Sequence, residues 1–63
     1  MSKLQEMRKA KGLNVKQLGE LAGVNHRMIE KYENGERDIG AAAARSVLAL
    51  ARALGCSVAD LIE

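Results

Sequence analysis

QLGELAGVNHRMIEKYENGER, residues Gln17–Arg37, is the stretch that decides the fold of this chain. It contains two short helical patterns. The first ends at Gly23, because glycine readily adopts the left-handed conformation that closes a helix. The second starts at Asn25, a favourable N-terminal cap, and stops at the pair Asn34-Gly35. The stretch therefore predicts two short helices joined by a sharp turn at Gly23.

The second of these helices has one apolar face and one polar face. At about 100° per residue, Ile29 and Tyr32 face inward, with Met28 at the edge. A helix can enter the DNA major groove if the preceding helix crosses it closely, and close crossing requires small residues such as Gly19 and Ala22. The polar residues at the tip or on the outer face are His26, Arg27, Glu30, Lys31 and Asn34.

The segment before this stretch predicts a bracing helix over Met1–Lys11. In a capping box, a short polar side chain and a side chain three residues later each satisfy a free backbone donor. Ser2 with Gln5, and Asn14 with Gln17, have this spacing. The sequence thus predicts one helix before Gly12 and another that begins after Asn14.

The segment after the stretch predicts a backing core. Gly40–Leu54 includes four consecutive alanines and then several large aliphatic residues, which predicts the longest helix, with Leu50 at the margin of its apolar arc. Ser57 and Asp60 predict a short fifth helix. We therefore expect one all-α domain over residues 1–63, built from five helices. Other side chains predicted to face inward are Val15, Leu18, Leu21, Ala22, Val58, Leu61 and Ile62.

Charge is distributed unevenly along the chain. Residues 1–37 hold eight Lys/Arg and five Asp/Glu, a net charge of +3, whereas residues 38–63 hold two and three, a net charge of −1. The basic part carries the predicted helix pair, as a nucleic-acid footprint requires. Double-stranded DNA is thus the expected partner.

Several other classes of function are disfavoured. His26 is the only histidine and Cys56 the only cysteine, so a disulfide, a metal site or a nucleophile–base pair is not expected. Cys56 is expected to be a small core residue. No apolar run approaches the roughly 20 residues that span a bilayer, and the N-terminus lacks a signal segment. We expect a cytoplasmic protein that is not an enzyme and uses no cofactor, metal or small-molecule ligand.

Taken in order, these features resemble the lambda-repressor-like helix-turn-helix domains, the Cro/C1-type or XRE-type regulators. The likeness extends over nearly the whole chain. It implies a compact five-helix fold whose second and third helices form the helix-turn-helix. The positions that carry the likeness are Arg8, Leu13, Leu18, Gly23, Ile29, Glu33-Asn34-Gly35, Arg37, Ala53-Leu54-Gly55-Cys56-Ser57-Val58 and Asp60-Leu61.

The resemblance implies base-reading roles at the second helix of the pair. Asn25, His26, Arg27 and Lys31 match the base-reading positions at its start and on its outer face. The chemistry of the side chains agrees, because arginine can pair with guanine edges and Glu30 can accept from cytosine.

The resemblance also implies contacts to the DNA backbone. Asn14 and Lys16 match the start of the preceding helix, which clamps the backbone, and Asn34 and Arg37 match the loop that holds the next phosphates. The remaining matched pair, which ties the first helix to the end of the recognition helix, is Arg8 and Glu33.

The sequence departs from the family pattern at several positions. Val15 stands where the family very often has a glutamine that contacts phosphate. Glu36 and Asp38 flank Arg37, where many members have basic residues or asparagine. The loop Asp38–Ala43 lacks the family's frequent proline, so no individual contacts are carried across it.

Two hypotheses follow. The first is a sequence-specific DNA-binding transcriptional regulator, a repressor that reads a pseudo-palindromic operator through the major groove as a homodimer. The second is a protein-interaction or antitoxin-like module of the same fold, with DNA binding secondary. Val15, Glu36 and Asp38 favour the second, because they weaken the phosphate clamp.

Overall fold

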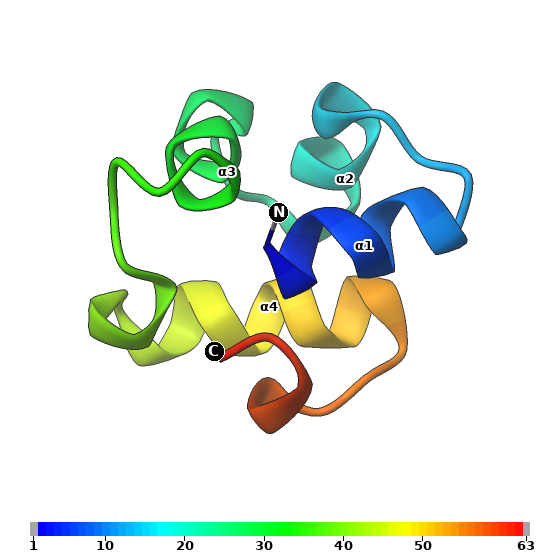
Figure 1. Cartoon of the computed structure of the whole chain (residues 1–63). Helices are drawn as coiled ribbons and strands as arrows, with labels where there is room; N and C mark the ends of the chain where they lie inside the picture. The colour runs from blue at the N-terminus through cyan, green and yellow to red at the C-terminus, as the bar shows by residue number, and fades with distance from the viewer. Residues whose placement is uncertain (1, 63) are drawn as a thin grey trace.

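The computed structural model describes residues 2–62, and this part of the chain contains four α-helices and two 3-10 turns. α2 and α3 lie beside each other on one side of α4, and α1 packs across the group (Figure 1). Among residues 2–62, no helix is both long and apolar enough to cross a membrane. In chain order the elements are α1 (Lys3–Ala10), α2 (Val15–Ala22), α3 (His26–Glu33), η1 (Ile39–Ala41), α4 (Ala44–Leu54) and η2 (Val58–Asp60).

Local capping interactions set most of the helix boundaries. The Asn14 side chain accepts from the Gln17 backbone N–H at 2.7 Å, and the Gln17 side chain accepts from the Asn14 N–H at 2.9 Å. At the start of α1, the Ser2 hydroxyl accepts from the Gln5 N–H at 3.0 Å. These contacts satisfy backbone donors that have no partner within the helix. The predicted starts of α1 and α2 therefore agree with the structure, although Met1 lies outside the described residues.

The predicted count of five helices and the predicted start of the longest helix were wrong. The Asp38 carboxylate accepts from the Gly40 N–H at 2.9 Å, and this contact begins the separate turn η1. The chain is extended at Ala42, and α4 begins only at Ala44, without a side-chain cap. The segment after Ser57 has the predicted capping box but forms a single 3-10 turn, η2, and not a fifth α-helix.

The core is aliphatic and centres on the inner faces of α2, α3 and α4. Leu50 is fully buried in it, so its predicted place at the margin of α4 was wrong. Cys56 is half-buried against this core, and burial raises the pKa of its thiol. The largest fully buried side chains are Leu4, Leu18, Ile29, Leu50, Leu54 and Leu61.

Three large apolar side chains of the described chain are exposed: Leu21 at 64%, Leu48 at 43% and Ile62 at 40%. Leu21 and Ile62 were predicted to face inward. Leu21 lies roughly 100° around α2 from the middle of the face that packs on α3 and α4, so it lies outside the contact. Ile62 follows the last turn η2, where Leu61 is fully buried and Val58 is half-buried against the core, whereas Ile62 stays at the surface.

Candidate nucleic-acid interface

A tight turn brings the start of α3 against α2. Gly23 has φ of 69°, in the left-handed region, and the N–H of Val24 donates to the Gly19 carbonyl at 3.0 Å. A Cβ atom at Gly19 would lie 2.7 Å from the Val24 carbonyl oxygen and 3.3 Å from the Cβ of His26. Only glycine therefore fits at position 19 without moving the first residues of α3.

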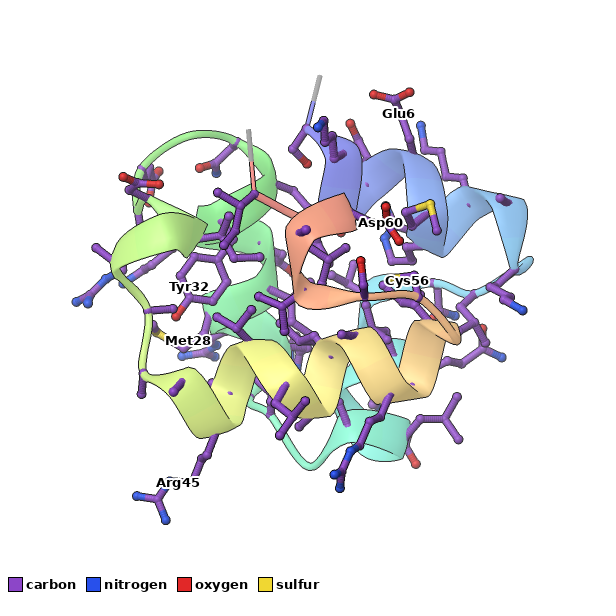
Figure 2. All side chains as sticks on the ribbon, turned by 90° about the horizontal axis from the view of Figure 1, so that it is seen from below. Glu6, Met28, Tyr32, Arg45, Cys56 and Asp60 are labelled. Carbon is purple, nitrogen blue, oxygen red and sulfur yellow. The ribbon has the colours of Figure 1, made fainter. Side chains whose placement is uncertain are left out.

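α3 turns one face into the core and leaves the other in solvent. Ile29 is fully buried, and Tyr32 and Met28 are half-buried on the inner side, next to the chain that leads into α4 (Figure 2). The outer residues are spaced at i, i+3, i+4 and i+7, which places them on one stripe of the helix about 10 Å long. This stripe, all of it exposed, consists of Arg27, Glu30, Lys31 and Asn34.

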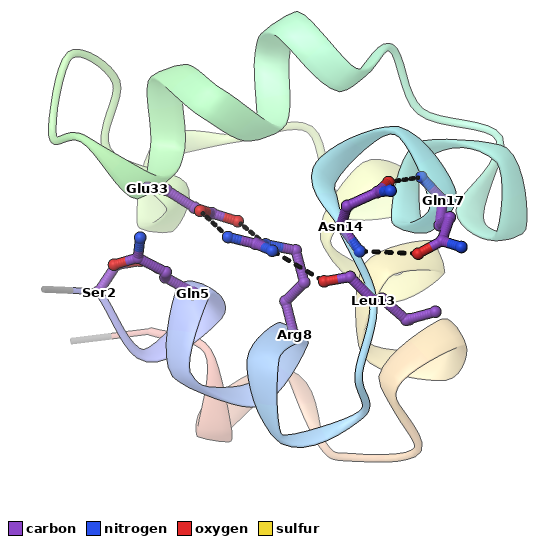
Figure 3. A network of polar contacts seen from close by, with 7 residues as sticks. All are labelled: Ser2, Gln5, Arg8, Leu13, Asn14, Gln17 and Glu33. Carbon is purple, nitrogen blue, oxygen red and sulfur yellow. Dashed lines mark hydrogen bonds and ion pairs between the residues drawn. The ribbon is translucent and has the colours of Figure 1, made fainter.

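One guanidinium group fixes α3 relative to α1 and α2. Arg8 donates from Nε to Glu33 Oε2 at 2.7 Å and from Nη2 to Glu33 Oε1 at 2.9 Å, and its Nη1 donates to the Leu13 carbonyl at 2.8 Å (Figure 3). The two side chains are 11% and 8% exposed. The hydrogen bond to Glu33 raises the pKa of Arg8, so the guanidinium stays charged. The end of α3 and the residue before the α2 cap are thus tied to the same group.

The starts of α2 and α3 both use an asparagine as a cap. Asn14 caps α2 through its side-chain oxygen, and the Asn25 oxygen accepts from the Arg27 N–H at 2.9 Å. Because the oxygens are occupied, each amide group remains available mainly as a donor, which suits an anionic partner. Neither helix has an acidic residue in its first turn, so the positive end of each helix dipole is not neutralised there.

Six of the nine residues predicted to contact DNA border three shallow hollows of the surface. Lys16, Asn25 and His26 line one hollow at the starts of α2 and α3. Glu30 and Asn34 line a second, beside α1. Arg37 borders a third together with Glu36 and Asp38. Arg27 and Lys31 lie on the ridge of α3 and line none of these hollows. The predicted contact residues are therefore spread along α3, its neighbouring loops and the start of α2, and they do not line a single pocket.

The loop after α3 is attached to that helix through its backbone. The N–H of Arg37 donates to the Lys31 carbonyl at 3.1 Å, and the Asn34 side chain accepts from the Glu36 N–H at 3.0 Å. Asn34 is therefore a loop-shaping residue as well as an exposed amide. Glu36 and Asp38 are exposed on either side of Arg37, where their charges oppose its attraction for phosphate.

Two residues near this surface were not predicted from the sequence to belong to it. Glu20 is exposed and lines the same hollow as Lys16, and Gln5 of α1 lines the hollow beside Glu30. Glu20 could have been found from its i, i+4 spacing to Lys16, which puts both on one face of α2. Gln5 could not, because its position depends on how α1 packs. Val15 is half-buried against the core, so it contributes packing and no phosphate-binding group.

The start of α3 packs against the preceding helix, its end is paired with α1, and a polar stripe is exposed between them, which is the arrangement of a helix-turn-helix domain. The sequence matches the helix-turn-helix family HTH_3 over residues 4–61. The chain belongs to this Cro/C1-type family, whose members are DNA-binding regulators of transcription. Comparisons with curated proteins and with solved structures gave no significant match.

Proposed function

We propose that the protein is a sequence-specific repressor that inserts α3 into the major groove of its operator. The observation that carries this proposal is the rigid mounting of the exposed stripe of α3, through the Arg8–Glu33 pair and the close approach at Gly19. A preorganised surface favours binding to DNA, because ordering long side chains and loops on contact reduces affinity. A cytoplasmic location is part of the same proposal.

The proposed contacts fall into two kinds. Arg27 and Lys31 on the ridge of α3, with Asn25, His26 and Glu30 beside them, reach base edges. Asn14 and Lys16 at the start of α2 reach the DNA backbone, where contacts position the protein without reading sequence. The backbone contacts after α3 come from Asn34 and Arg37.

The proposed repressor acts as a homodimer, at least on DNA. One eight-residue recognition helix touches few base pairs, and a second copy about 34 Å away on a pseudo-palindrome doubles that number. The proposed contact between copies is the apolar groove where Ile39, Val58 and Ile62 meet. Among residues 2–62, none that lines this groove is charged, which favours contact between two identical copies there.

An unbiased selection of bound DNA sequences tests the proposal. We expect a consensus with two inverted half-sites, and the distance between their centres should be close to one helical turn. Enrichment of no sequence at about 0.1 M salt would exclude the proposal, since the remaining affinity would then be non-specific attraction to phosphate. A single half-site would retain sequence reading and exclude the dimer.

A protein-interaction or antitoxin-like module is the second candidate. The exposed carboxylates of Glu36 and Asp38 beside Arg37, and the lack of an amide at Val15, support it. Stable capture of a protein partner without DNA, together with no consensus in the DNA selection, would favour this second function over the first.

A further inference from the structure

A groove between the end of α2 and the outer face of α4 has no part in the proposed DNA contacts. Its volume is about 780 Å³, and Leu21 and Val24 form one of its walls. The opposite wall comes from α4, with Arg45 and Arg52 among its residues. None of the proposed base-reading or phosphate-binding residues lines it.

The α4 wall has a regular pattern. Arg45, Leu48, Ala49 and Arg52 are spaced at i, i+3, i+4 and i+7, so they form one stripe on the side of the helix opposite the buried Leu50. The two arginines stand two helical turns apart, roughly 10 Å along the axis, with Leu48 and Ala49 between them. Arg45 extends away from the ribbon into solvent (Figure 2).

The groove also gathers exposed apolar surface. Leu21, 64% exposed, and Leu48, 43% exposed, are two of the three exposed large apolar residues in the described part of the chain, and both line it. Single exposed leucines are ordinary on a protein surface. Two across one groove, with a cation at each end, form the pattern of an interaction site.

Charge decides what kind of partner fits. No acidic residue among residues 2–62 lines this groove, and neither Arg45 nor Arg52 has an ion pair within that part of the chain. A second copy docked symmetrically here would bring four guanidinium groups together, and like charges across an interface are unfavourable. An occupant with carboxylates would pair with both arginines.

We propose that this groove binds an acidic amphipathic helical segment of another protein. Its carboxylates lie two turns apart and pair with Arg45 and Arg52, and the apolar residues between them cover Leu21 and Leu48. Binding of an amphipathic helix in an apolar groove with charged ends is a common mode of peptide recognition. Because Val24 borders both this groove and the hollow at Lys16, the bound segment lies beside the start of α3.

A display library of random peptides of about 14 residues, enough for two turns and flanks, tests this proposal on the whole chain. The sequences to be scored are those retained by the protein and not by an Arg45→Glu/Arg52→Glu variant. We expect a consensus with acidic residues seven positions apart and leucine-like residues between them. A consensus without acidic residues, or no enrichment over the variant, overturns the proposal.

The best-enriched peptide, synthesised with a fluorescent label, then gives the affinity and the place of binding. Arg52→Glu and Leu21→Asn should each weaken it by about tenfold or more, whereas Lys9→Ala on the far helix should leave it unchanged. Amide chemical shifts should move in residues 21–24 and 45–53. Shifts confined to α3 would place the peptide on the DNA surface and overturn the proposal.

Two further measurements distinguish the proposed peptide from DNA and from a second copy as the partner of this groove. An Arg45→Gln/Arg52→Gln variant, checked for folding by circular dichroism, should bind selected DNA within about threefold of wild type, because these arginines contact no phosphate in the proposed complex. A larger loss of DNA affinity would assign the arginines to phosphate instead. Loss of self-association in that variant would assign the groove to a second copy. Failure of DNA selection itself would leave the peptide result standing, because the two surfaces share no tested residue.

Discussion

Arg8 makes hydrogen bonds to two segments that are far apart in sequence, the end of α3 and the residue before the α2 cap. Removing one partner of a pair this buried leaves the other charge without compensation, which costs roughly 3 kcal/mol or more. Since a chain of this size has little stability to spare, that loss is a large fraction of the total. Arg8→Ala should therefore lower the urea midpoint sharply.

Lys9→Ala is the matched control for Arg8→Ala. Lys9 is the neighbouring cation on α1 but is exposed, so its removal should change the unfolding free energy by less than about 0.5 kcal/mol. Equal effects of the two substitutions would mean that the buried pair contributes no more than a surface charge.

Gly19→Ala sets two effects of opposite sign against each other. Helix propensity alone would stabilise α2 by up to about 1 kcal/mol. The added Cβ would lie 2.7 Å from the Val24 carbonyl oxygen, a backbone atom that moves only with the turn, and such overpacking costs about 1–3 kcal/mol. We expect net destabilisation together with weaker binding to selected DNA, because α3 is displaced.

Gly12→Ala is the control that separates loss of stability from loss of DNA affinity. Gly12 has φ of +69°, and no atom lies within 4 Å of the place that a Cβ would take, so alanine there introduces backbone strain without a collision. It should lower stability but leave the DNA affinity of the folded protein unchanged. If Gly19→Ala also keeps full affinity for DNA, the close approach at Gly19 does not determine where α3 lies.

Asp60 predicts a dependence of stability on pH. Hydrogen bonds from the backbone and side chain of Ser57 lower the pKa of Asp60 in the folded protein, below its ordinary value of 3.8. A group with a lowered folded pKa stabilises the fold above its unfolded pKa, and this contribution disappears as the pH falls through the folded pKa. Asp60→Asn should thus flatten the fall in melting temperature below about pH 4. An unchanged acid limb would exclude this role.

At the level of the helices, signals within a few residues of one another were predictable. Asn14 with Gln17 forms the α2 capping box, and Gly23 ends that helix, because both depend only on neighbouring backbone groups. The start of α4 was not predictable in this way. Alanines favour helix wherever they stand, so their run gives no boundary, and the bond from Asp38 that begins η1 competes with the helix.

The sequence pattern also did not predict which face of α4 points outward. Alanine counts as apolar on any face, so the arc from Ala44 to Leu54 looked wide enough for Leu50 to lie at its margin. Packing of α4 on α2 and η2 selects one side of that arc, which buries Leu50 and exposes Leu48. The buried side of α4 is set by the angle at which it crosses helices that are distant in sequence, and a local sequence pattern does not report that angle.

The two helices of the motif should respond differently to substitution. Arg27→Ala on α3 removes a proposed base contact, so preference should relax at one operator position, with a loss of about 1–3 kcal/mol for the preferred base. Lys16→Ala on α2 removes a proposed phosphate contact, so all sequences should weaken alike and the salt slope should fall by about one unit. Titrations of selected and scrambled DNA at several salt concentrations measure both. Indistinguishable profiles would refute this division of roles.

Across the whole molecule, the positive charge is less concentrated on the proposed DNA face than the count for residues 1–37 indicates. The Arg8–Glu33 ion pair is largely buried and carries no net charge. Glu20, Glu30 and Glu36 are exposed near the cations of this face. The net attraction for phosphate is correspondingly moderate. The proposed repressor would therefore need base contacts and a second copy for selective binding, because charge alone would not supply it.

Dimer formation is the property of the whole molecule that the apolar groove at Ile39, Val58 and Ile62 predicts. Ile62 is 40% exposed, and burying it against a second copy would contribute on the order of 1 kcal/mol in each protomer. Ile62→Asn should therefore weaken binding to a two-half-site operator by about tenfold or more and leave binding to one half-site unchanged. Leu21→Asn is the control, because Leu21 is exposed but lies in the other groove. Band shifts on both DNA lengths at several protein concentrations measure this, and equal losses on both lengths would place the contact between copies elsewhere.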